Sequence, residues 1–353
     1  GGADVVDVQP SNGEPGSATV EIGADAEVTV TATNTFATGD LAIRKRVTGG
    51  AVEYAPDEFT VMVVCTDGDE VVLDETYVLG PGNGYSVLIR EELPYGAECV
   101  VTEEDAGQTT TTIVPGVATI GPDDEVFVTN DYPDGRLEIV KDVVTDAVDA
   151  DGLKPALGPF HVEVTCTYEG EEGWGEGYGV LAPMEADLVD GESWVIEGLP
   201  ADAECTVTET VTAGATGPSI TVVSGDGDPA TTEGTTVDVT LTPAEGGGEV
   251  VTISNPFDSG DLTIEKSVTG PGASELGGGP FVFSVVCTLP QPAGEILTWT
   301  GEVTLGGDAP LEATIEDIAS GSGCVIEEVD AAGADESTVT PGVVTIGVDD
   351  EVV

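Results

Sequence analysis

Three lysines in this sequence occupy identical positions on strands where a charge is costly to bury. Two apolar residues precede each lysine with a period of two, as in Leu41-Ala42-Ile43-Arg44-Lys45. Because alternate residues of a strand point to the same face, the lysine shares the face that the apolar residues bury. The repeated lysines are Lys45, Lys141 and Lys266. A buried ammonium is unfavourable unless it is paired or neutralised, so each lysine needs a partner.

A glutamate follows the second cysteine of each repeat on the inward face of its strand. In Cys99-Val100-Val101-Thr102-Glu103 the cysteine and the glutamate are four residues apart and therefore share one face. The glutamates in this position are Glu103, Glu209 and Glu328. A buried carboxyl group close to a buried amine is therefore expected in each repeat.

Each complete repeat closes on a strand that ends with an asparagine. The closing sequences Thr129-Asn130-Asp131-Tyr132 and Ser254-Asn255-Pro256-Phe257 correspond, and Thr33-Asn34-Thr35-Phe36 is a further copy near the N-terminus. The first and last strands of a β-sandwich can lie side by side. The asparagine of the last strand then meets the lysine of the first strand in the same repeat.

This arrangement pairs Lys45 with Asn130 and Lys141 with Asn255, while no asparagine follows Lys266 in this sequence. Desolvation lowers the pKa of a buried lysine and raises the pKa of a buried glutamate. The neutral amine attacks the carboxamide, the protonated glutamate relays protons, and ammonia leaves. Effective molarities of about 10⁵–10⁸ M make such a single-turnover reaction feasible. The alternative is a lysine that reaches the sheet edge and forms an ordinary salt bridge with the glutamate.

The strands that position these residues recur three times along the chain. Each repeat opens on Gly-x-Leu-x-Ile-x-Lys, continues with an alternating strand that ends in cysteine, and resumes at a partner cysteine. Short Val- and Thr-rich strands separated by Gly, Pro and Asp predict an all-β fold of tandem immunoglobulin-like or B-type β-sandwich modules. Modules one, two and three are expected at residues 38–133, 134–258 and 259–353, with an acidic, Gly-rich insertion in module two around 224–228.

The two ends of the chain are expected to hold incomplete modules. Residues 1–37 contain a closing sequence and are predicted to be the C-terminal part of a preceding module. Module three stops before its closing asparagine and is predicted to lack the end of its closing strand. The links between modules are only a few residues long, which favours an extended rod over independent beads.

The six cysteines fall two to a module, on inward-facing strand positions. This usage predicts one disulfide per module and an oxidising, extracellular location. The predicted pairs are Cys65–Cys99, Cys166–Cys205 and Cys287–Cys324. Each bond is expected to contribute about 3–4 kcal/mol. The alternative is buried free thiols.

The charge of the chain excludes several classes of partner. Lys and Arg number 8 and Asp and Glu number 68, for a formal net charge of −60. Nucleic acids and anionic membrane surfaces would be repelled. No run approaches the roughly 20 apolar residues that span a bilayer, so no membrane insertion is expected within this sequence.

The ordered set of motifs resembles the B-type repeat domains of Gram-positive collagen adhesins and pilins. The closing sequence Thr129-Asn130-Asp131-Tyr132 is similar to the motif that carries the reactive asparagine there, and Val207-Thr208-Glu209-Thr210 is similar to the glutamate motif. The opening motif and the paired cysteines also resemble tandem repeats of actinobacterial surface proteins. The resemblance implies autocatalytic Lys–Asn isopeptide bonds with glutamate as the proton relay. The Pro-Gly-Tyr that usually follows the glutamate is absent, and Glu104 and Glu327 are neighbouring carboxylates.

Other candidate sites are weaker. His161 lies between inward-facing residues and is expected to point outward. The acidic groups Asp226 with Asp228, and Asp123-Asp124-Glu125, could hold Ca²⁺, but solvated turns are the favoured explanation. No other cofactor is expected. The tryptophans, which could form a ligand patch or serve as packing anchors, are Trp174, Trp194 and Trp299.

These observations favour a non-enzymatic stalk on a bacterial cell surface, built of cross-linked modules. The alternative is an adhesin in which loops of module two bind a surface ligand, through residues such as Trp174 and Tyr178. The expected partners are neighbouring modules or head-to-tail copies. In the second case, the strand around Asn34 of one copy completes module three of another copy beside Lys266.

Overall fold

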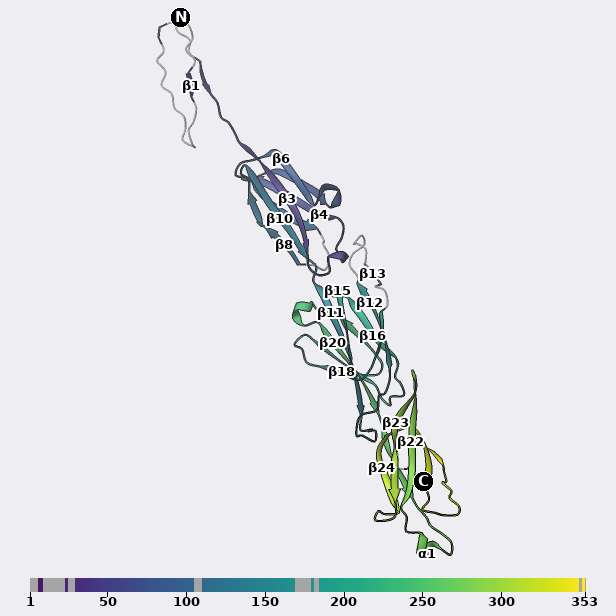
Figure 1. The fold of residues 1–353 in the computed structure, drawn as a ribbon. Helices are drawn as coiled ribbons and strands as arrows, with labels where there is room; N and C mark the ends of the chain where they lie inside the picture. The colour runs from purple at the N-terminus through teal and green to yellow at the C-terminus, as the bar shows by residue number, and fades with distance from the viewer. Residues whose placement is uncertain are drawn as a thin grey trace. The chain divides into compact units, whose positions relative to one another are not determined.

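The computed structural model describes residues 6–8, 23–24, 29–104, 110–168, 179–180, 184–348 and 351–352 (Figure 1). The chain divides into two compact units, Gly1–Thr48 with Pro56–Asp131, and Gly49–Ala55 with Tyr132–Val353. The first unit contains module one, and the second contains modules two and three. The described residues are mainly strand, so the fold is all-β with tandem modules, as the sequence predicts.

Module one consists of two sheets that enclose an apolar core. One sheet has the strand order β6-β3-β10-β8 and the other β5-β4-β7-β9. The strands are β3 (Thr38–Thr48), β4 (Phe59–Asp67), β5 (Glu70–Leu79), β6 (Ser86–Pro94), β7 (Glu98–Glu104), β8 (Thr110–Val114), β9 (Val117–Thr119) and β10 (Asp123–Asp131). Alternate residues of β3 and β4, including Leu41, Ile43, Val61 and Val63, are buried in the core between the sheets.

Module two repeats this arrangement and adds a hairpin. Its sheets have the orders β15-β11-β20-β17-β18 and β13-β12-β16-β19, and β14 also pairs with β12. The strands are β11 (Asp134–Thr145), β12 (Phe160–Tyr168), β13 (Gly179–Val180), β14 (Met184–Leu188), β15 (Ser193–Pro200), β16 (Glu204–Val211), β17 (Ser219–Ser224), β18 (Ala230–Glu233), β19 (Thr236–Thr240) and β20 (Glu249–Phe257). The acidic, Gly-rich insertion forms the turn of the β17–β18 hairpin.

Module three has sheets of order β24-β21-β27 and β23-β22-β25-β26. The strands are β21 (Ser259–Glu265), β22 (Phe281–Gln291), β23 (Gly294–Leu305), β24 (Glu312–Ala319), β25 (Gly323–Asp330), β26 (Val343–Thr345) and β27 (Glu351–Val352).

The described part of the chain has few helices, and all of them are short. They are α1 (Ala273–Leu276) and the 3₁₀ turns η1 (Val52–Tyr54), η2 (Pro81–Asn83) and η3 (Ala244–Gly246). None of the described helices is long and apolar enough to cross a membrane.

The first and last strands of each module run parallel and adjacent. Strand β10 pairs with β3, β20 pairs with β11, and β27 pairs with β21. Parallel neighbours cannot be joined by a tight turn, so the rest of the module forms the connection between them. The pairing therefore places residues near the two ends of a module side by side.

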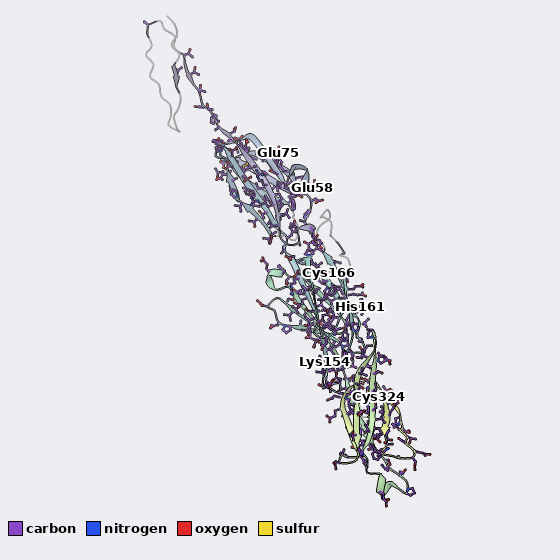
Figure 2. All side chains as sticks on the ribbon, viewed as in Figure 1. Glu58, Glu75, Lys154, His161, Cys166 and Cys324 are labelled. Atoms are coloured by element: carbon purple, nitrogen blue, oxygen red, sulfur yellow. A yellow bond between two sulfur atoms is a disulfide. The ribbon has the colours of Figure 1, made fainter. Side chains whose placement is uncertain are left out.

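A disulfide joins the two central strands of the opposite sheet in each module. The bonds are Cys65–Cys99, Cys166–Cys205 and Cys287–Cys324. The cysteines of each pair lie directly opposite each other on antiparallel strands, as in the pairing of β4 with β7. All six side chains are buried (Cys166 and Cys324 are labelled in Figure 2).

Within the N-terminal segment the structure describes a short strand, β2 (Val30–Ala32), which pairs in parallel with β1 (Val6–Val8). The assignment of residues 1–37 to a preceding module stays a prediction. Asn34 lies beyond β2 outside any strand and is exposed, and Phe36 is 87% exposed.

Modules two and three pack against each other within the second unit. Leu289 and Ala319 of module three form one buried apolar cluster with Val143, Leu157 and Phe160 of module two. The tip of the β22–β23 hairpin adds two hydrogen bonds. The side-chain oxygen of Gln291 accepts from the Gly158 amide at 2.8 Å, and its nitrogen donates to the Ala213 carbonyl at 3.3 Å.

Leu289→Asp should open this joint while each module stays folded, because the new carboxylate would lie in an apolar cluster. Hydrogen exchange by mass spectrometry should then show faster exchange at the Gly158 amide, which loses its acceptor. Val286→Asp on the same strand is the control, because Val286 is 37% exposed. Unchanged exchange in Leu289→Asp would mean that the apolar cluster does not hold the modules together.

Candidate functional site

Lys45 lies in the core of module one with its charge beside a buried carboxylate. Strand β3 buries Leu41 and Ile43 on one face, and Lys45 follows on that face with a fully buried side chain. Its Nζ lies 2.8 Å from Oε1 of Glu103, whose side chain is 2% exposed. Glu103 comes from β7 in the facing sheet, so the pair crosses the core between the sheets.

Asn130 lies diagonally across the parallel ladder from Lys45. In the register of β10 with β3, Val128 is opposite Lys45 and Asn130 is opposite Val47. Residues two apart on a strand share a face, so Asn130 and Lys45 project into the same side of the sheet. Asn130 is completely buried.

Several buried polar atoms of this site have no hydrogen-bond partner among the described residues. Neither Oδ1 nor Nδ2 of Asn130 has a hydrogen-bond partner among the described residues. Lys45 and Glu103 are close enough for an ion pair, yet Lys45 Nζ is not aligned for a hydrogen bond within the described part of the chain. A buried, unpaired carboxamide is destabilising by about 1–3 kcal/mol, so this arrangement needs an explanation.

Module two contains the same three residue types in a tighter cluster. Lys141 and Glu209 have fully buried side chains, with Nζ and Oε1 3.3 Å apart. The Nδ2 atom of Asn255 donates to both carboxylate oxygens of Glu209 at 3.0 Å. Lys141 Nζ donates to the Ile253 carbonyl at 2.9 Å, which brings it onto strand β20 two residues before Asn255. Oδ1 of Asn255 has no donor among the described residues.

Burial shifts the protonation of these groups toward their neutral forms. Desolvation lowers the pKa of Lys45 and of Lys141, and the nearby glutamates oppose it only in part. Desolvation likewise raises the pKa of Glu209, against the opposing effects of Lys141 and Asn255. In module two both pKa shifts run toward a neutral amine and a protonated carboxyl group, which are the forms that amide chemistry uses.

An aromatic ring covers the lysine in every module. The Nζ atoms of Lys45, Lys141 and Lys266 lie 4.3, 4.4 and 4.7 Å from the ring centroids of Phe59, Phe160 and Phe281. Each phenylalanine begins the second long strand of its module. The sequence shows these residues only as core positions, and their recurrence at the same place in all three repeats is the signal that could have identified them. The ring excludes water from the amine.

Module three holds the lysine and the glutamate. Lys266 Nζ lies 2.6 Å from Oε1 of Glu328, with side chains 14% and 1% exposed. The Ser337 hydroxyl donates to the other carboxylate oxygen. Strand β27 contributes Glu351 and Val352 beside β21, and no asparagine among the described residues pairs with β21. The pairing of Lys266 with Asn34 of another copy stays a prediction.

The neighbouring glutamates occupy different positions. Glu104 is exposed at the end of β7, and Glu327, which precedes Glu328 on β25, is exposed on the outward face.

His161 is partly exposed, as the sequence predicts. Its Nδ1 lies 2.7 Å from Asp187, and the hydrogen bond between them raises the pKa of the imidazole.

The remaining candidates hold no visible site. The described residues contain no cluster of three or more potential metal ligands. Glu125 pairs with Arg44, Asp124 accepts a hydrogen bond from the Gly121 amide, and Asp226 and Asp228 are exposed.

The tryptophans that the structure describes serve packing. Trp194 packs against the core of module two and Trp299 against the core of module three. Trp174 and Tyr178, which the adhesin hypothesis invokes, lie outside the described residues.

The fold and the site together define a class of tandem β-sandwich modules, each with a disulfide in one sheet and a buried Lys–Glu pair between the sheets. The chain belongs to the family described as Domain of unknown function (DUF5979), whose model matches residues 41–133, 137–254 and 262–353. No curated protein matches the chain at a significant level.

Solved structures similar to the chain include pilins and adhesins. A major pilin (T3.2) of Streptococcus pyogenes is 14% identical with a TM-score of 0.41, over 62% of this chain and 98% of that chain. Another crystal structure of the S. pyogenes major pilin is 13% identical with a TM-score of 0.37, over 63% and 99%. An adhesin of Mobiluncus mulieris containing intramolecular disulfide, isopeptide and ester cross-links is 15% identical with a TM-score of 0.27, over 58% and 86%.

In a variant that cannot react, Asn255→Ala, module two should lose stability as the pH rises above about 4.5. The folded pKa of Glu209 is raised above its ordinary 4.5, so its contribution to stability is present below that value. The contribution is lost as the pH rises through the folded pKa. Lys141 does not cause this change. Because its pKa is lowered in the folded module, it adds to the stability only at alkaline pH.

Urea unfolding followed by tryptophan fluorescence measures this, with Trp299→Phe included so that the signal reports module two. The matched control adds Glu209→Gln and should flatten the dependence on pH. A stability that rises over this range relative to the control would show that Glu209 is ionised in the folded module.

Proposed function

We propose that modules one and two form the isopeptide bonds Lys45–Asn130 and Lys141–Asn255, and that the chain is a structural stalk of a bacterial surface protein. The observation that carries the proposal is the buried carboxamide of Asn130. Its polar atoms are unpartnered within the described residues, and it lies diagonally adjacent to a lysine paired with a buried glutamate. Formation of an amide removes the unpaired groups and the buried charge together.

The reaction balances without any further reagent. In module two, neutral Lys141 attacks Cγ of Asn255 through Nζ, and the bond between Cγ and Nδ2 breaks. The proton that Nζ loses passes through the Glu209 carboxyl group to Nδ2, which leaves as ammonia. Nδ2 already lies 3.0 Å from both Glu209 oxygens, so the path for the proton is one hydrogen bond long. Half a turn of the carboxamide would instead present Oδ1 to a protonated Glu209, which would polarise the carbonyl.

A bond at this position suits a protein that bears tension. The chain enters a module through its first strand and leaves it through its last strand, and these strands are parallel neighbours. A covalent link between them carries force directly from one to the other and leaves the rest of the module unloaded. The reaction consumes its own residues, so it is a self-modification without turnover, and the chain is not an enzyme.

An extracellular location agrees with the covalent and electrostatic character of the chain. Three buried disulfides form and persist in oxidising compartments. The formal net charge of −60 keeps such a surface hydrated and opposes aggregation. A stalk on the cell surface, attached to the wall or part of a fibre, requires both properties.

The intact mass of the reduced protein should be lower than the sequence mass by two molecules of ammonia, one for each of modules one and two. Peptide mapping should recover Lys45 joined to Asn130 and Lys141 joined to Asn255. In Lys45→Arg, the mass deficit should fall from two ammonia molecules to one, and the bond of module two serves as an internal standard. A mass equal to the sequence mass would show that no cross-link forms and that the lysines make ordinary salt bridges.

Glu103→Ala should leave module one folded and prevent its bond, because the proton relay is lost. The bond of module two should be unaffected and calibrates the measurement within the same molecule. Glu104→Ala is the matched control, since this neighbouring carboxylate is exposed and should not alter the mass. If the Glu103→Ala protein still formed the bond, another group would have to relay the proton.

A further inference from the structure

Module three repeats, on its own surface, the features by which module two receives the β22–β23 hairpin. The receiving surface of module two consists of Gly158-Pro159-Phe160, the turn at Ala213-Gly214, and Val143. Gln291 bonds to two of these segments, and Leu289 joins the apolar cluster that contains Phe160 and Val143.

Two segments of module three have the same local structure as their counterparts in module two, and a third corresponds in sequence. Gly279-Pro280-Phe281 stands where module two has Gly158-Pro159-Phe160, and both glycines have a positive φ, of 78° and 108°. The turn at Ala332-Gly333 matches Ala213-Gly214, with both alanines at a positive φ of 54°. Val268 lies two residues after Lys266, as Val143 lies two residues after Lys141, but Val143 is part of β11 whereas Val268 follows the end of β21. The hairpin-receiving surface is thus a repeated feature of the module.

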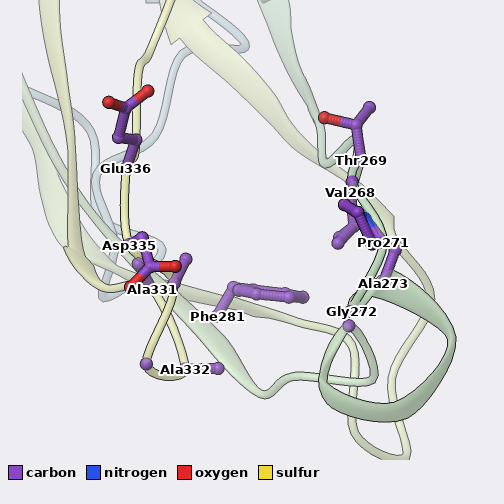
Figure 3. Close-up of a pocket in the computed structure, with 14 residues that line it drawn as sticks. Val268, Thr269, Pro271, Gly272, Ala273, Phe281, Ala331, Ala332, Asp335 and Glu336 are labelled. Atoms are coloured by element: carbon purple, nitrogen blue, oxygen red, sulfur yellow. The ribbon is translucent and has the colours of Figure 1, made fainter.

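A pocket of about 420 Å³ lies at this surface of module three. Phe281 lies between one wall that contains Ala331 and Ala332 and a second wall that contains Val268 and Pro271 (Figure 3). Asp335 and Glu336 lie at the side of the first wall. In module two, the corresponding space is occupied by Leu289 and Ala319 of module three and by Phe257 of module two's own closing strand, whose ring centroid lies 6.2 Å from that of Phe160.

We infer that this pocket is a socket for the β-hairpin tip of another module, one that presents an aliphatic side chain and a carboxamide in the arrangement of Leu289 and Gln291. The inference rests on the joint between modules two and three and is independent of isopeptide chemistry. The hairpin tip that docks on module two, Thr288–Gly294, carries no charge in a chain of net charge −60.

The hairpin of module one is a poor occupant. Its tip reads Asp67-Gly68-Asp69-Glu70, and Asp335 and Glu336 of the socket would repel these carboxylates. The corresponding segment of module two, Glu169-Gly170-Glu171-Glu172, is equally acidic in sequence. The uncharged tip, rather than a second copy docking through module one, therefore fits the socket.

A constrained peptide tests the inference on the whole chain. The probe spans residues 287–299, with Trp299→Cys so that a disulfide to Cys287, its opposite residue, fixes the hairpin. Its binding is followed by fluorescence anisotropy, and the contact is located by hydrogen exchange. We expect saturable binding with protection at residues 331–336 and at the Gly279 amide, which corresponds to Gly158.

Matched variants give the proposal its controls. Thr269→Trp, at an exposed position of the pocket wall, and Ala332→Arg should each weaken binding about tenfold or more. The probe carrying Leu289→Asp should bind as weakly. Val343→Arg should have no effect, because Val343 is 63% exposed on β26 and does not line the pocket.

Three results would overturn the inference. The first is no binding at millimolar probe, and the second is equal binding by the Thr269→Trp and Ala332→Arg proteins. The third is protection confined to Ser267 and Val268, which would mean that the probe adds as a strand beyond β21. None of these results bears on whether Lys45 and Lys141 are cross-linked, so the two proposals fail separately.

Discussion

The burial of a lysine amine in an apolar core is the constraint on which each module depends. An ammonium at that depth requires a carboxylate, and the carboxylate is itself stable there only beside a cation or in its protonated form. Lys141 and Glu209 meet this requirement with both side chains fully buried. Such a pair contributes little net stability compared with apolar residues of similar volume. Its presence in the described parts of all three modules is therefore part of the support for the proposed cross-link.

The two residues of this pair come from different sheets of the module. The lysine and the asparagine belong to the sheet in which the first and last strands are parallel. The glutamate belongs to the other sheet, as does the phenylalanine that covers the amine, and the disulfide joins their two strands. In module one, Cys99 and Glu103 lie on β7 while Cys65 and Phe59 lie on β4. The disulfide thus holds together the two strands that bring the acid and the ring to Lys45.

Much of this arrangement could be predicted from alternation and repetition alone. Period-two patterns placed Lys45 and Glu103 on inward faces, and the structure buries both side chains. Predicting that Asn130 lies near Lys45 required one further assumption, that the first and last strands of the module are neighbours. The ladder of β3 with β10 has that arrangement. The contact of Phe59 with Lys45 was missed, because alternation shows that a residue is buried but does not identify its neighbour in the facing sheet.

The joint between modules two and three was beyond sequence reasoning for a different reason. Leu289 reads as one more inward-facing strand residue and Gln291 as part of a polar turn, yet both contact the preceding module. Contacts between modules depend on the angle at a short linker, and no periodic pattern encodes that angle. Phe160 belongs to the apolar cluster of this joint and also covers Lys141, so the joint and the buried lysine site share a residue. Docking of module three therefore helps to keep water away from the Lys141 amine, so the contact between modules also shapes the environment in which the proposed cross-link would form.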